Sequence, residues 1–296
     1  ADKLALVAAP AFDYVAYRSP LEAWVGVVCY SLQLYFDFSG YSDMAIGLAR
    51  MFSIKFPFNF NSPYKAASII DFWARWHMTL TRYLTLYLYN PISMSVNRRR
   101  LAAGKKVSRK AQKTIPGFLS MIAWPTMITM FLAGVWHGAG TQFLIFGLLH
   151  GIFITINHAW RNFKERPAAD APVPVWRHAG SVLLTYMCVL LGQIFFRANS
   201  VHDAMTMLAS MTGIRHLPMS RTIPAIGYWP LVLLPFVWFL PNTQQIFKQI
   251  GNTNVSRFWQ RLTYSPTWGW TVSMSLLFVV AVLYASDTAT FLYFQF

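Results

Sequence analysis

The chain has 296 residues, of which 55% are hydrophobic and only 12% are charged. A soluble domain carries about 25% charged residues and cannot bury this much apolar surface, so the composition excludes an ordinary soluble protein. Lysine and arginine outnumber the acidic residues by 25 to 10, and these basic residues lie in short connections between apolar runs. That distribution favours cytoplasmic loops and contact with anionic lipid, and it argues against a nucleic-acid partner.

Apolar runs predict an all-α, multi-span membrane protein that forms a single domain over residues 1–296. Each run approaches the length that crosses a bilayer, and about six spans are recognisable, at 21–36, 117–135, 142–158, 179–196, 223–240 and 267–285. The basic connections 97–113 and 161–178 lie on the cytoplasmic side by the positive-inside rule. The chain begins at Ala1 without a methionine or the pattern of a signal peptide, and we interpret it as a portion of a longer protein.

Residues 35–43 place two carboxylates in an aromatic setting at the end of the first span. Asp37 and Asp43 must therefore be hydrogen-bonded or face water, and anchoring of a helix end is the simpler interpretation of both. The following stretch, 56–64, contains Asn61 between two prolines and cannot form a regular helix. We therefore expect an irregular, polar connection after the first helical region.

Residues 68–89 show the pattern of one long amphipathic helix that lies in the membrane interface. At 100° per residue Trp76 shares one stripe with Phe72, Thr79, Tyr83 and Tyr87. Asp71 and Arg75 lie on a second stripe, spaced as an i,i+4 ion pair. His77 lies on a third side, where a histidine is more often part of a core than of a catalytic site.

One histidine, His137, lies between two apolar spans within residues 131–141, where Trp136 precedes it and glycines flank it. An ionisable side chain in such a place is costly unless it reacts or has a partner. The chemistry alone leaves a reactive histidine and a hydrogen bond between helices equally open. His150, in the middle of the next span, is interpreted as a hydrogen-bonding residue between helices, with the lining of a reaction path as the alternative. The sequence shows no histidine or cysteine spacing of a metal site.

Five motifs follow one another in the chain: YFDFSGYSDMAIG at 35–47, NFNSPY at 59–64, DFWARWHMTL at 71–80, VWHGAG at 135–140 and FLYFQF at 291–296. In this order they resemble the membrane-bound O-acyltransferase (MBOAT) family, and most closely its bacterial alginate O-acetyltransferase branch. The sequence departs from that branch after His77, where Leu84-Thr85-Leu86-Tyr87 and Ile92-Ser93-Met94-Ser95 replace the usual pattern.

The resemblance implies a ring of transmembrane and interfacial helices around a tunnel that joins the two membrane faces. It implies that His137 is the catalytic histidine and that His77 is a second important one. Further candidates for the substrate path are Trp136, Asp37, Asp71, Arg75, Trp76, His150 and Asn61. No metal is expected.

The resemblance also implies the reactants and the location of the protein. No bound cofactor is expected, and the acyl donor would be acetyl-coenzyme A or an acyl carrier protein on the cytoplasmic side. The acyl group would pass to hydroxyl groups of an exported polysaccharide, with a periplasmic SGNH-type acyltransferase as a possible partner. The protein would lie in the bacterial inner membrane.

A hydroxyl that attacks a thioester must lose its proton, and a neutral imidazole can accept that proton. We therefore expect His137 to be the general base and His77 to orient the donor or to hydrogen-bond the acyl carbonyl. Two other classes stay open. One is a transporter or channel, because histidines in spans also relay protons, although the inverted repeat that would favour it is not recognisable. The other is a non-catalytic scaffold that holds a periplasmic acyltransferase.

Overall fold

The computed structural model describes residues 1–164, 173–214, 228–247 and 263–284. Within these ranges every regular element is helical, which confirms the predicted all-α class. Three segments are long and apolar enough to cross a membrane, by length and composition: Ile115–His137, Thr141–Phe163 and Val175–Arg197. They contain the predicted spans 117–135, 142–158 and 179–196.

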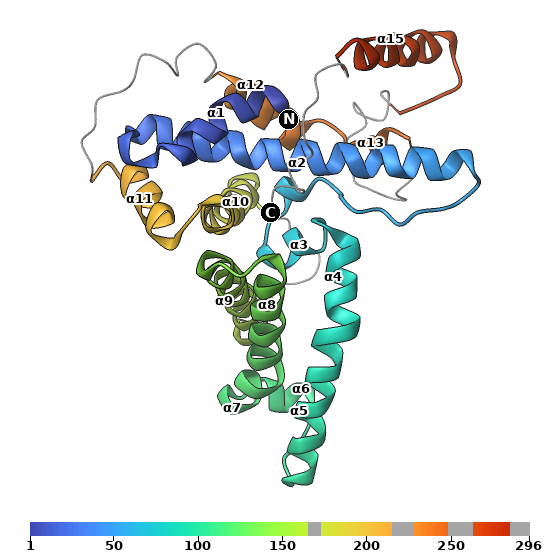
Figure 1. Ribbon diagram of the computed structural model, residues 1–296. Coiled ribbons are helices and arrows are strands. Elements are labelled where there is room, and N and C mark those ends of the chain that lie inside the picture. Colours follow the sequence, from blue (N-terminus) through green and yellow to red (C-terminus); the bar gives the residue numbers. More distant parts are fainter. Residues whose placement is uncertain (165–172, 215–227, 248–262, 285–296) are drawn as a thin grey trace.

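The N-terminal helices form one layer of the molecule, and α2 runs along its whole width (Figure 1). α1 (Asp2–Asp13) packs against α2 (Pro20–Met51). Ser19 and Glu22 cap the start of α2 through a reciprocal capping box, which satisfies backbone N–H groups at the helix end. The predicted span 21–36 is thus only the first part of this helix of 32 residues.

The prediction of one continuous helix at 68–89 is wrong. The chain forms α3 (Ile69–Trp73), leaves the helical conformation, and resumes as α4 (Met78–Leu84). A π-helical turn, η3 (Thr85–Tyr89), then leads into α5 (Asn90–Ala102). Helical structure therefore extends into the basic run that the sequence pattern placed in a loop.

Long-range backbone hydrogen bonds account for the break between α3 and α4. The N–H of Asn61 donates to the carbonyl of Arg75 at 3.0 Å, and the N–H of Met78 donates to the carbonyl of Asn59 at 2.9 Å. These bonds occupy a carbonyl and an N–H group that an uninterrupted helix would pair within itself. His77 adopts the left-handed conformation at this turn, with φ of +42°. The irregular loop before α3 thus sets the backbone geometry of His77.

The two spans on either side of His137 form an α-helical hairpin. α7 (Ile115–Phe118), the π-helical turn η4 (Leu119–Ala123) and α8 (Trp124–His137) make up the first span. α9 (Thr141–Phe163) is the second, and it packs along α8. Figure 1 shows this pair below α2, with α4 and α5 beside it.

Glycines allow α8 and α9 to approach each other closely. A Cβ atom at Gly134 would lie 2.5 Å from the carbonyl oxygen of Phe143, and one at Gly147 would lie 2.4 Å from that of Met130. Both distances are shorter than any tolerated contact, so only glycine fits at these crossing points. Small residues at these positions therefore allow the backbones of the two helices to pack directly against each other.

α10 (Val175–Arg197) contacts both α9 and α2 and so joins the hairpin to the N-terminal layer. α11 (Val201–Met211) and α12 (Trp229–Phe239) contact α2 as well. The remaining described α-helices are α6 (Arg109–Gln112), α13 (Thr243–Ile246) and α15 (Trp268–Tyr284), and two 3₁₀ turns, η1 (Val15–Tyr17) and η2 (Pro63–Lys65), complete the described elements. The centre of the molecule is therefore the region where α2, α3, α9 and α10 meet.

The last two predicted spans correspond to shorter helices. α12 and α15 lie within the predicted spans 223–240 and 267–285, and both are apolar but shorter than the three long segments. Residues 223–227, residue 285 and the motif at 291–296 lie outside the described residues. The total of about six spans stays a prediction.

Candidate active site

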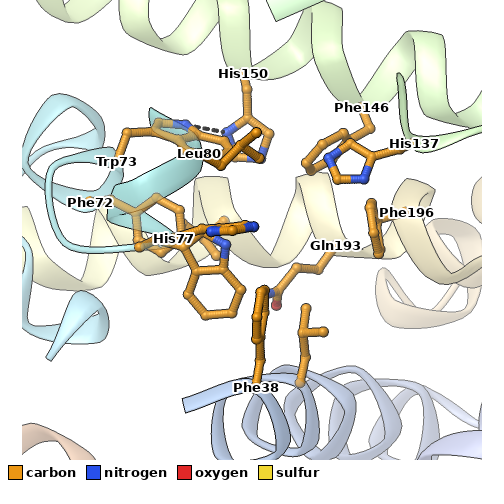
Figure 2. A pocket seen from close by; sticks show the side chains of 13 residues that line it. Phe38, Phe72, Trp73, His77, Leu80, His137, Phe146, His150, Gln193 and Phe196 are labelled. Carbon is orange, nitrogen blue, oxygen red and sulfur yellow. Dashed lines mark hydrogen bonds between the residues drawn. The ribbon is translucent and has the colours of Figure 1, made fainter. Parts of the chain in front are cut away.

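Three histidines from separate segments line one pocket (Figure 2). His77 comes from the break between α3 and α4, His137 is the last residue of α8, and His150 lies on α9. The cavity has a free volume of about 40 Å³, more than the roughly 10–15 Å³ that one water molecule needs. The other lining residues are largely apolar or aromatic: Leu34, Phe38, Phe72, Trp73, Trp76, Leu80, Phe146, Val189, Gln193 and Phe196.

The side chain of Asn59 fixes the proton position on His77. Asn59 Oδ1 accepts hydrogen bonds from Thr79 Oγ1 at 2.8 Å and from the Thr79 N–H at 3.4 Å, so this atom is the amide oxygen. His77 Nδ1 lies 2.9 Å from the same oxygen and must therefore carry a proton. Since the ring is neutral, its Nε2 is an unprotonated hydrogen-bond acceptor. Asn59 Nδ2 donates to Ser42 Oγ at 3.2 Å, which holds the amide in this orientation.

Burial, with a smaller contribution from the nearby His137, lowers the pKa of His77 to about 4. We expect the stability of the protein to fall as the pH is lowered from 6.5 to 4. The pKa in the unfolded chain is the ordinary 6.5, so the unfolded chain binds a proton first as the pH falls. The stabilisation is complete above pH 6.5 and is lost by about pH 4. The difference between the pKa of His77 in the folded and the unfolded chain corresponds to about 3 kcal/mol in the free energy of unfolding.

This pH dependence can be measured as the midpoint of thermal unfolding of the detergent-purified protein between pH 7 and pH 4. His77→Asn is the matched variant, because asparagine tolerates the left-handed backbone and does not titrate. Its unfolding midpoint should fall less steeply over this range than that of the wild type. Parallel curves for the two proteins would contradict the assignment of a buried, neutral His77.

His137 ends α8 and presents its ring to the pocket. The helix stops there because the next residue, Gly138, has φ of +158° and lies against the ring of Phe143, with no room for a Cβ atom. The imidazole lies edge-on to Phe146 and Phe196, with ring centroids 5.6 and 5.0 Å apart. Its ring nitrogens make no hydrogen bond to any described residue. Both are therefore available to a ligand.

Trp73 fixes the tautomer of His150. The imidazole is 2% exposed, and its Nδ1 lies 3.3 Å from Trp73 Nε1 (Figure 2). An indole nitrogen can only donate, so Nδ1 is the acceptor and the proton of the neutral ring is on Nε2. That nitrogen is directed to α10, where a Cβ atom on Gly192 would lie only 2.4 Å from it. The predicted hydrogen bond between helices exists, and the same residue also lines the pocket.

The remaining predicted site residues fall into two groups. Trp76 lines the pocket and is 9% exposed. The predicted ion pair between Asp71 and Arg75 is confirmed, with Oδ1 and Nε 2.8 Å apart. The residues that do not line this pocket are Asp37, Asn61, Asp71, Arg75 and Trp136.

Two of these residues have contacts that indicate a different role. Asn61 Oδ1 accepts a hydrogen bond from Asn242 Nδ2 at 3.0 Å, which ties the irregular loop to the start of α13. Arg75 donates from its guanidinium to the carbonyl oxygen of Asn61 at 3.5 Å. Trp136 is 59% exposed, although its ring lies 4.9 Å from that of His137. The first two residues thus support the loop that positions His77.

Gln193 is a pocket residue that the sequence reasoning missed. It lies in the apolar run of α10 and is 4% exposed. A polar side chain within a membrane span is costly, and this feature of the sequence could have identified Gln193 as a candidate. The sequence also gave no indication that Phe146 and Phe196 enclose His137.

Larger cavities adjoin the pocket at Trp73. One of about 340 Å³ lies between the α3–α4 segment and the α8–α9 hairpin, and its lining includes Trp73, Thr81 and His158. Another, of about 880 Å³, is lined by Trp73 and residues of α4, including Arg82. Trp73 therefore forms a wall shared by all three spaces. Within the described ranges, no group of three or more histidine, cysteine or acidic residues could hold a metal ion.

The sequence is similar to several bacterial proteins that are named as acyl-transferring enzymes. The chain is 33% identical to a peptidoglycan O-acetyltransferase of Helicobacter pylori, over all of this chain and 53% of the relative. It is 32% identical to a Pseudomonas putida protein named "Probable alginate O-acetylase AlgI", over all of this chain and 58% of the relative. A teichoic acid D-alanyltransferase of Bacillus subtilis is 30% identical over 58% of this chain and 40% of the relative. The chain thus spans little more than half the length of the first two.

The fold and the site together define a helical membrane protein with a buried pocket of histidines. Residues 6–105, which include His77, match the model of the membrane-bound O-acyltransferase family. With the relatives above, this match shows that the chain belongs to that family.

Proposed function

We propose that the full-length protein is a membrane-embedded O-acyltransferase. It moves an acetyl or short acyl group from a thioester donor, acetyl-coenzyme A or an acyl carrier protein, at the cytoplasmic face of a bacterial inner membrane. The acceptor is a hydroxyl group of an exported polysaccharide or cell-wall polymer. The observation that carries this proposal is the meeting of His77, His137 and His150 in one largely apolar pocket. The names of the relatives support the acceptor class.

The free nitrogens of His137 suit the role of general base. The acceptor oxygen attacks the thioester carbonyl carbon while His137 takes the hydroxyl proton. The carbon–sulfur bond then breaks, and the protonated histidine returns the proton to the leaving sulfur. The products are the ester and a free thiol, and His137 is restored to its neutral form.

The tautomers of the other two histidines assign them complementary roles. His150 carries its free proton on Nε2, on the α10 side of the pocket beside Gly192, and we assign this N–H to the acyl carbonyl, where negative charge develops. His77 can only accept at Nε2, so it orients an N–H or O–H group of a substrate. This arrangement replaces the expectation that His77 itself bonds the carbonyl.

Labelled acetyl-coenzyme A and the purified full-length protein test this proposal directly. Alginate oligosaccharides and peptidoglycan fragments serve as acceptors, with and without an SGNH-type partner. We expect labelled ester to form, and His137→Ala to abolish it. Label that reaches glycan only with the partner, and equally with His137→Ala, would instead identify a scaffold. Proton flux into proteoliposomes without any acyl transfer would identify a transporter.

A further inference from the structure

Gln193 contributes an unpaired hydrogen-bond acceptor to the histidine pocket. Its side chain is buried in the pocket wall, and it extends from α10 toward Phe38 in Figure 2. Gln193 Nε2 donates to the hydroxyl of Tyr64 at 3.2 Å. Its Oε1 is buried and has no hydrogen-bond partner among the residues that the structure describes. Such buried, unsatisfied oxygens are rare in folded proteins, and one in a pocket wall points to a ligand.

A buried network fixes the orientation of this amide. The Tyr64 hydroxyl donates to the backbone carbonyl of Ser31 at 2.7 Å, and a carbonyl can only accept. Ser31 Oγ donates to the Tyr64 oxygen at 2.8 Å, and the hydroxyl of Tyr186 donates to Ser31 Oγ at 3.2 Å. Tyr64 therefore has no proton left for Gln193. The amide must turn its NH₂ group to Tyr64, which leaves Oε1 without a partner.

We infer that Gln193 Oε1 accepts a hydrogen bond from an O–H or N–H group of the ligand in the histidine pocket and thereby positions it. This inference rests on the proposed acyl transfer for the identity of the ligand. Two reactants carry suitable groups: the acceptor glycan has hydroxyls, and the pantetheine arm of acetyl-coenzyme A has amide N–H groups. Both reactants would present a neutral hydrogen-bond donor to Oε1. The KM for acetyl-coenzyme A and the KM for the glycan, measured separately, show which of them does so.

Gln193→Met tests the inference, because methionine is similar in length and lacks the carbonyl oxygen. Initial rates are measured with acetyl-coenzyme A and alginate oligosaccharides or peptidoglycan fragments. We expect KM for one reactant to rise about tenfold, the value of one hydrogen bond, while KM for the other changes less than twofold. A higher KM for the glycan identifies a hydroxyl, and a higher KM for acetyl-coenzyme A identifies an amide. Unchanged KM values for both would overturn the inference.

Two further variants separate a direct contact from a structural effect. Tyr186→Phe removes a hydroxyl of the same network but leaves the bond between Gln193 and Tyr64, so both KM values should stay at the wild-type level. In Gln193→Glu a protonated carboxyl group can donate to Tyr64 and keep a carbonyl oxygen at this position, so its KM should lie nearer to the wild type than that of Gln193→Met. Equal KM increases in all three variants would show only that the network supports the fold.

A binding measurement keeps this inference separate from the proposed function. The thermal unfolding of wild type and Gln193→Met is followed with acetyl-coenzyme A alone and with each glycan alone, so no turnover is required. A ligand that stabilises the wild type but not the variant supports the role of Oε1, even where no acyl transfer is found. Equal shifts in both proteins, including no shift, would contradict it.

Discussion

Replacing His137 with alanine is expected to lower the rate of acetyl transfer by about a thousandfold. A general base contributes between about a hundredfold and ten-thousandfold to a rate. The unprotonated nitrogen of His150 is occupied by Trp73, and the free Nε2 of His77 is assigned to a substrate group, so the loss of His137 should cost a value within this range. The measurement is the initial rate of labelled ester formation from acetyl-coenzyme A by detergent-purified protein.

The control for this variant is His202→Ala on α11, because His202 is exposed and lies outside the pocket lining. Its transfer rate should match that of the wild type. The unfolding midpoint of His137→Ala should stay near the wild-type value, since the ring makes aromatic contacts but no hydrogen bond to described residues. Full activity in His137→Ala would exclude the assignment of His137 as the base. Loss of folding together with activity would also remove its support.

The sequence predicted the three long membrane helices because their apolar runs are uninterrupted and each is bounded by basic residues or glycines. The glycines at the contact between α8 and α9 are a local signal of the same kind, because small residues mark close helix packing in membranes. These features depend on local composition and periodicity. Such information is contained in the segment itself.

The break between α3 and α4 could not be predicted in this way. Residues 68–89 keep a helical period throughout, and the groups that interrupt the helix, Asn59 and Asn61, belong to an earlier loop. Only tertiary structure brings this loop against Arg75 and Met78. Two long-range hydrogen bonds therefore override the helical pattern of residues 68–89. As a result, His77 is not oriented as it would be in a continuous helix.

The site was predicted in part. The resemblance indicated His137 and His77, and the structure shows that both line one pocket with His150. The resemblance does not distinguish residues that line the pocket from residues that support it within the same motif. Asp71 and Arg75 were therefore predicted as site residues together with Trp76. Gln193 lay outside every motif. Its importance depends on the Tyr64 network, which joins α2, the loop after it and α10.

Gly192→Ala is expected to reduce acetyl transfer by about a hundredfold. The new methyl group would lie 2.4 Å from His150 Nε2 and 3.0 Å from Cδ2, so the ring must move. Movement by about 1 Å is enough for such a loss when the displaced group binds the reacting carbonyl. It would also strain the hydrogen bond to Trp73. Initial rates with acetyl-coenzyme A measure this effect.

Gly180→Ala is the matched control, because Gly180 lies on the same helix and has open space where a Cβ atom would be. Alanine there should stabilise α10 by about 0.5–1 kcal/mol and leave the transfer rate unchanged. Replacing glycine by alanine within the helix should favour helix formation at position 192 too. If Gly192→Ala is stable but inactive, its lost transfer activity is therefore attributed to the displaced ring of His150. Equal activity of both variants would mean that the position of His150 does not matter to transfer. The carbonyl-binding role would then have to be withdrawn, while the assignment of His137 as the base would stand on its own test.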